Sequence, residues 1–170
     1  GCTFWFVVPL KRRQGGALAP ASPFAGLLVE QRLQQDFAGS RILLAEDEPI
    51  AQEVARCLLE DVGLRVDLAG DGLQALALAR KNRYALVLMD MQMPRLNGVE
   101  ATKAIRAESL NSTTPILAMT ANAFDEDRQI CLEAGMNEHI AKPVNPQRLF
   151  ETLLAWLERG SVSEVADKHE

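Results

Sequence analysis

The chain has no excess of positive charge. Lysine and arginine number 18 against 23 aspartate and glutamate residues, the net charge is −5, and the one basic run is Lys11-Arg12-Arg13. Such a surface cannot neutralise a row of phosphates, so we expect no nucleic-acid partner.

Cysteine and histidine are also scarce. Cys2, Cys57 and Cys131 are far apart and form no Cys-x-x-Cys pair, and His139 has no second histidine or cysteine at ligand spacing. Cys57 and Cys131 fall in helical patterns, where cysteine usually packs as a small apolar residue. We therefore expect a reducing, cytoplasmic environment and no metal site built from histidine or cysteine.

Long apolar runs are absent as well. The longest N-terminal run, residues 4–10, is far below the roughly 20 residues that span a bilayer. Its positive charges follow it, whereas those of a signal peptide precede the apolar stretch. The chain also starts with Gly1 rather than Met. We expect a fragment of a longer protein that makes no membrane contact of its own.

What is present is a repeated strand-and-helix pattern. From residue 41 onward it occurs five times, with strands expected at 42–45, 65–69, 85–89, 116–119 and 138–141. The first, third and fourth strands are continuously apolar, as in strands buried on both faces, whereas Arg65 to Leu68 alternates as an edge strand does. This pattern predicts an α/β fold with a parallel sheet.

Two helices should present apolar stripes to that sheet. Asn145 and Pro146 suit the N-cap and first position of the last helix. The expected stripes are Ile50, Val54, Leu58 and Val62 in the first helix of the repeat, and Leu149, Leu153, Trp156 and Leu157 in the last.

Polar residues follow four of the strands. Asp90 ends the third strand, Glu46 and Asp47 follow the first, Thr120 follows the fourth and Lys142 follows the fifth. The carboxyl ends of parallel strands open on one edge of the sheet, where such folds bind ligands. Each residue alone would pass as a turn former or helix cap, but together they predict one site.

Three carboxylates this close repel one another unless a cation intervenes. Hard oxygen ligands suit Mg²⁺, with Mn²⁺ as a possible substitute.

The sequence motifs around these residues resemble those of the receiver domain of response regulators. Met-Asp-Met-Gln-Met-Pro-Arg-Leu-Asn-Gly around Asp90, Thr-Ala-Asn from Thr120 and Ala-Lys-Pro-Val around Lys142 are most similar to receivers at the C-terminal end of hybrid sensor histidine kinases. The resemblance covers residues 41–157. It implies a doubly wound, flavodoxin-like receiver fold of five parallel strands in the order 2-1-3-4-5, with an N-terminal extension.

The resemblance also implies roles for the site residues. Asp90 would accept a phosphoryl group from phosphohistidine, and Thr120 and Lys142 would contact its oxygens. Asp47 and Asp90 would bind the metal directly, Glu46 through water, and Gln92 through its backbone carbonyl. Lys142-Pro143 would be a cis peptide.

Thr120 and His139 would form the switch of the receiver. Receivers commonly carry Tyr or Phe at the position of His139, so an exposed histidine without this role is equally open. The implied partners are a histidine kinase dimerisation and phosphotransfer domain of the same parent chain, and a histidine phosphotransfer protein that receives the group next.

The remaining segments complete the expected organisation. Residues 1–10 resemble the closing strand of a kinase ATP-binding domain, 11–40 form a linker, 41–158 the receiver and 159–170 a polar tail. Within the linker we expect a helix at 23–37, capped by Ser22, with Val29, Leu33 and Phe37 on one face. The apolar run at residues 4–8 would be buried on its own receiver or in a homodimer.

Three other functions remain as alternatives. A phosphatase of the haloacid dehalogenase type needs an acid or threonine two positions after its nucleophile, where this chain has Gln92. A receiver that binds partners without phosphorylation would lack one of Asp90, Thr120 or Lys142. A nucleotide-binding flavodoxin-like protein would need a glycine-rich loop after the first strand instead of acids.

Overall fold

The computed structural model describes residues 23–121 and 125–166. The segment 1–10 and the cap expected at Ser22 lie outside the described residues. The elements follow in the order α1 (Pro23–Asp36), β1 (Arg41–Ala45), α2 (Pro49–Asp61), β2 (Arg65–Ala69), α3 (Gly72–Lys81), β3 (Leu86–Asp90), α4 (Gly98–Glu108), β4 (Ile116–Thr120), α5 (Asp125–Ala134), β5 (Glu138–Ala141) and α6 (Pro146–Ala166).

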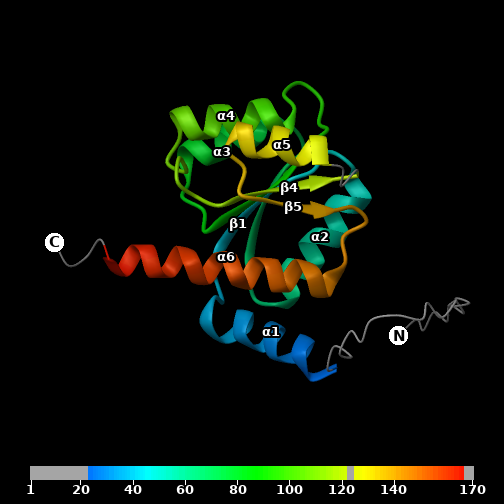
Figure 1. Ribbon diagram of the computed structural model, residues 1–170, viewed down its shortest axis with the longest axis vertical. Coiled ribbons are helices and arrows are strands. Elements are labelled where there is room, and N and C mark those ends of the chain that lie inside the picture. Colours follow the sequence, from blue (N-terminus) through cyan, green and yellow to red (C-terminus); the bar gives the residue numbers. More distant parts are fainter. Residues whose placement is uncertain (1–22, 122–124, 167–170) are drawn as a thin grey trace, which may run out of the picture.

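The five strands form one parallel sheet in the order β2-β1-β3-β4-β5, with helices on both faces (Figure 1). The expected α/β fold and strand order are confirmed, and β2 is at an edge as its alternating sequence predicts. Each strand begins and ends within one residue of the expected bounds.

Alternate residues of the buried strands supply two separate cores. Ile42 and Leu44 of β1 face the side covered by α1, α2 and α6, whereas Leu43 and Ala45 face the side covered by α3, α4 and α5. Continuously apolar strands are therefore required, because both faces of the sheet are buried.

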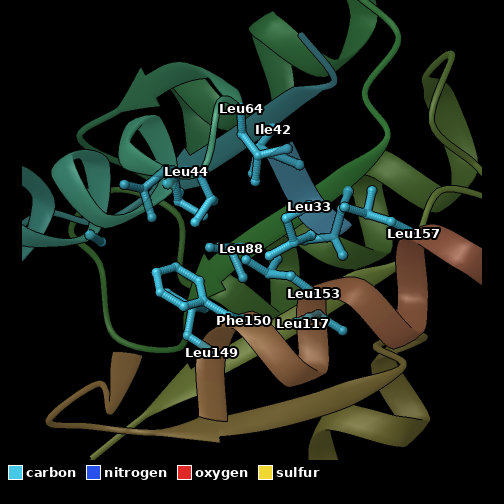
Figure 2. Close-up of a cluster of buried hydrophobic side chains, with 14 of the residues drawn as sticks. Leu33, Ile42, Leu44, Leu64, Leu88, Leu117, Leu149, Phe150, Leu153 and Leu157 are labelled. Carbon is cyan, nitrogen blue, oxygen red and sulfur yellow. The ribbon is translucent and has the colours of Figure 1, made fainter. Parts of the chain in front are cut away.

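The helix expected at 23–37 is present as α1, and it is part of the folded unit. Leu33 is fully buried among Leu153 and Leu157 of α6 and residues of the sheet (Figure 2), and Val29 and Phe37 pack against the same cluster. Arg32 also pairs with Glu158 of α6.

The stripe expected on α2 is wrong at its N-terminal half. Ile50 is 73% exposed and Val54 52% exposed, whereas Ala55 and Leu59 are buried against the sheet. The helix therefore turns the face that carries Ala55 and Leu59 to the sheet, and the face that carries Ile50 and Val54 to the surface.

The last helix also differs from expectation. Leu149, Leu153 and Leu157 are buried as predicted, but Trp156 is only half-buried, and its indole nitrogen donates a hydrogen bond to Glu138 at 2.6 Å. The helix continues to Ala166, past the boundary expected at residue 158. Asn145 caps it as expected, accepting from the backbone N–H of Arg148 at 3.0 Å.

Candidate functional site

The strand ends bring the predicted residues to one edge of the sheet. Asp90 is the last residue of β3 and Thr120 the last of β4, and Glu46 follows β1 directly. Asp90, Thr120, Glu46, Asp47 and Lys142 all line one cleft. Gln92 lines it too, so every residue predicted for phosphoryl or metal binding lies in this cleft.

Lys142 bridges two of the acids. Its ammonium nitrogen lies 2.7 Å from a carboxylate oxygen of Glu46 and 2.8 Å from Oδ2 of Asp90. Both acids are buried, with 2% of Glu46 and 5% of Asp90 exposed, whereas Asp47 is exposed. The lysine is positioned by β5, whose continuation is held to β4 by the hydrogen bond from the N–H of Lys142 to the carbonyl of Thr120 at 2.8 Å. The Lys142-Pro143 peptide is cis, as expected.

The charges in the cleft shift two protonation equilibria. Burial raises the pKa of Glu46 and the charge of Asp90 raises it further, although the hydrogen bond from Lys142 opposes this. Burial by itself lowers the pKa of Lys142, but its hydrogen bonds and attraction to Asp90 and Glu46 outweigh burial and raise it. The lysine is therefore held as a cation between the two acids.

Backbone hydrogen bonds orient the acids. The N–H of Glu48 donates to Glu46 at 3.2 Å, and the N–H of Gln92 donates to Oδ1 of Asp90 at 3.1 Å. The second oxygen of Asp90 accepts from Lys142. Asp90 is thereby fixed at both oxygens on the floor of the cleft.

The carboxylates form a donor set that suits a hard divalent cation. One oxygen from each of Glu46, Asp47 and Asp90 lies within 4.8 Å of the other two. Three negative charges face the single positive charge of Lys142, so a cation with oxygen preference would relieve the remaining repulsion. These residues fit a Mg²⁺ site, as the sequence predicted.

The structure adds residues that the strand-end pattern did not predict. Glu48, rather than Glu46 or Asp47, caps α2, accepting from the N–H groups of Ile50 at 3.1 Å and Ala51 at 2.6 Å. An acid immediately before Pro49 at the first helical position is a recognisable cap signal, and it leaves the other two acids for the cleft.

His139 lies in β5, half-buried, in register with Ala118 of β4. Thr120 is buried at the cleft. Their proposed role as a switch stays a prediction.

Comparison with known proteins agrees with the fold and the cleft. The family model described as the response regulator receiver domain matches residues 42–154. The chain belongs to this family. It is thus a receiver domain of the two-component type, and its role is that of a phosphoacceptor.

Two solved structures of histidine kinases or their receivers are similar to this chain. The receiver domain of sensor histidine kinase PA1611 from Pseudomonas aeruginosa PAO1, solved with a magnesium ion coordinated in its active site cleft, is 45% identical with a TM-score of 0.67, covering 71% of this chain and 99% of that one. Full-length ShkA in complex with AMPPNP is 44% identical with a TM-score of 0.64, covering 75% of this chain and 26% of that one.

Among curated proteins, Histidine kinase 1 of Arabidopsis thaliana is 33% identical in an alignment 167 positions long, which covers 78% of this chain. Transcription factor SKN7 of Saccharomyces cerevisiae is 39% identical over 119 residues, or 70% of this chain. The chain spans 14% of the kinase and 19% of the transcription factor. Among the described residues, no helix is both long and apolar enough to cross a membrane.

Proposed function

We propose that the chain is the receiver of a hybrid histidine kinase, in which Asp90 accepts a phosphoryl group from phosphohistidine in a Mg²⁺-dependent step. The group then passes to a histidine phosphotransfer protein. The observation that carries this proposal is the buried carboxylate of Asp90, fixed at both oxygens within a cleft that also holds two further acids and a lysine.

The chemistry follows from these positions. A carboxylate oxygen of Asp90 attacks phosphorus, and an O–P bond forms as the P–N bond of the phosphohistidine breaks. The leaving nitrogen keeps the electron pair and is protonated by solvent. Bound Mg²⁺ would supply positive charge for the phosphoryl oxygens and the acids. Asp47, Asp90 and the backbone carbonyl of Gln92 are the proposed direct ligands, Glu46 would bind through water, and Mn²⁺ would be accepted in place of Mg²⁺.

Lys142 and Thr120 stabilise the transferred group. The ammonium of Lys142, which contacts Oδ2 of Asp90 at 2.8 Å, turns to a phosphoryl oxygen once Asp90 carries the phosphoryl group as an acyl phosphate. The hydroxyl of Thr120 donates a hydrogen bond to another oxygen. Both residues line the same cleft as Asp90, which supports these roles.

The surface beside the cleft supports a protein donor. Ile50 and Val54 of α2 are exposed, one turn apart, and α2 begins directly after the acids at 46–48. Exposed apolar side chains next to a reactive group suit a partner that buries them while it presents its histidine. The scarcity of cysteine supports a cytoplasmic location for this receiver. Cys57 is exposed rather than packed.

Intact-mass spectrometry tests the proposal. The full chain treated with acetyl phosphate and Mg²⁺ should gain one phosphoryl group, and Asp90→Asn should gain none. Asp61→Asn makes the same chemical change at the exposed end of α2 and should label as the wild type does. Undiminished labelling of Asp90→Asn would refute the assignment.

A further inference from the structure

The loop that follows Asp90 has a strained conformation. Arg95 has a φ of 68°, and the N–H of Leu96 donates to the carbonyl of Pro94 at 2.8 Å. A bond from residue i+2 to residue i with a positive central φ defines the rarer form of γ-turn. Residues that carry a side chain rarely adopt a positive φ, so surrounding contacts must hold Arg95 in this conformation.

Those contacts come from the N-terminus of α3. A guanidinium nitrogen of Arg95 lies 3.3 Å from Oδ2 of Asp71, whose side chain is only 5% exposed. Asp71 is itself fixed, because its Oδ1 accepts from the N–H of Gln74 at 2.8 Å as the cap of α3. An otherwise exposed arginine is thus anchored to a buried, immobile carboxylate.

Two glycines hold the same loop at other points. A Cβ on Gly72 would collide with the carbonyl of Leu96, and a Cβ on Gly98 would collide with the carbonyl of Asp90. The N–H of Gly98 also donates to the carbonyl of Met91 at 3.1 Å. These close approaches fit the loop against α3 and against the phosphoacceptor.

We propose that Asp71 and Arg95 are a positioning pair that holds the loop 91–97 in the conformation presenting Gln92 to the cation. Neither residue touches the cation. The pair acts through the loop backbone, in which the N–H of Gln92 already contacts Asp90 at 3.1 Å and the carbonyl of Gln92 is a proposed ligand. This inference rests on the proposed function of the cleft.

Two conservative variants isolate the ion pair from other roles of the same residues. Arg95→Gly removes the charge but keeps a residue that adopts positive φ freely. Asp71→Asn removes the charge but keeps a good helix cap. Loss of the pair should weaken Mg²⁺ binding about tenfold, the lower end of the effect of residues that orient metal ligands. The double variant should be no weaker than either single one, because both remove the same interaction.

The measurement is a Mg²⁺ titration of the full chain by calorimetry, followed by acetyl phosphate labelling at saturating Mg²⁺. The pair is supported if affinity falls in both single variants without further loss in the double variant, while labelling at saturation returns to the wild-type level. Arg83→Gly, in the exposed loop before β3 at the opposite end of that strand, is the matched control and should keep wild-type affinity.

The outcomes separate the two proposals. Unchanged affinity in Arg95→Gly or Asp71→Asn, additive losses in the double variant, or reduced labelling at saturating Mg²⁺ would overturn the positioning pair while leaving the receiver function intact. A wild-type chain that neither binds Mg²⁺ nor labels would instead refute the proposed function. Asp47→Ala removes a proposed ligand, and its Mg²⁺ affinity is the reference for a severe loss of binding.

Discussion

At the scale of single residues, the side chain of Asn111 connects separate segments of the fold through four hydrogen bonds. Asn111 is fully buried, and its Oδ1 accepts from the N–H of Tyr84 at 2.8 Å and from the hydroxyl of Thr114 at 3.0 Å. Its Nδ2 donates to the carbonyls of Ala79 and Asn82, both at 2.7 Å. One side chain thereby satisfies the backbone at the end of α3 and before β3.

Asn111→Asp should destabilise the fold strongly. A carboxylate oxygen would replace the amide nitrogen and face two carbonyl oxygens, leaving both acceptors unsatisfied in a buried site. We expect a loss of about 3 kcal/mol in the free energy of unfolding, measured by urea denaturation. Asn145→Asp is the matched control, because aspartate caps a helix as well as asparagine does. Equal stability of the two variants would contradict this role for Asn111.

At the scale of elements, α1 extends the receiver beyond the matched residues 42–154. Leu33→Ala should lower the free energy of unfolding by about 3 kcal/mol, because it leaves a cavity between α1 and α6. Leu28→Ala removes the same atoms from a position on this helix that is 59% exposed, and should change stability by less than about 0.5 kcal/mol. Urea denaturation of both variants measures the difference, and similar losses would show that α1 does not contribute to the core.

Much of the architecture could be predicted because it depends on local patterns. Continuous apolar runs gave the buried strands, and the polar residues after them gave the cleft, since parallel strands place their carboxyl ends together. The orientation of α2 could not be predicted, because exposed Ile50 and Val54 continue the same four-residue spacing as buried residues. Periodicity identifies a helix, but exposed apolar residues can have the same spacing as a buried stripe.

Residues whose roles depend on contacts between segments far apart in the sequence could not be predicted from local patterns. Asp71 and Arg95 meet only because the loop after β3 folds onto the start of α3. Asn111 likewise bonds to residues about thirty positions away. Such pairs depend on the completed fold, whereas Glu48 could have been identified as a cap from Pro49 alone.

At the scale of the whole molecule, a polar network at the end of the sheet opposite the cleft limits stability in alkali. The hydroxyl of Tyr84 donates to Asp67 at 2.7 Å, and Arg41 pairs with the same carboxylate at 2.6 Å. Burial, followed by the hydrogen bond to Asp67, raises the pKa of Tyr84 to about 12. An unfolded tyrosine has a pKa of about 10.

The sign of the effect follows from the raised pKa. The folded state keeps the Tyr84 proton more tightly, so its contribution to stability is complete below about pH 10 and is lost as the pH rises toward 12. The chain has one tyrosine, so phenolate absorbance reports this residue alone. We expect no phenolate step near pH 10 in the folded chain and a midpoint of about 10 in concentrated urea. A step near pH 10 with the circular dichroism of the fold intact would contradict the network.

In the hybrid kinase that we propose, the docking of α1 limits how far the receiver can move. The segment between α1 and β1 is held to the receiver by backbone hydrogen bonds. The N–H of Gly39 donates to the carbonyl of Gly63 at 2.8 Å, and the N–H of Arg65 donates to the carbonyl of Ser40 at 2.9 Å. Of the linker expected at 11–40, residues 23–36 form α1 and pack against α6, which shortens any tether to a preceding domain. A shorter tether confines the receiver to a smaller volume around its attachment point and raises its effective concentration at any histidine within that volume.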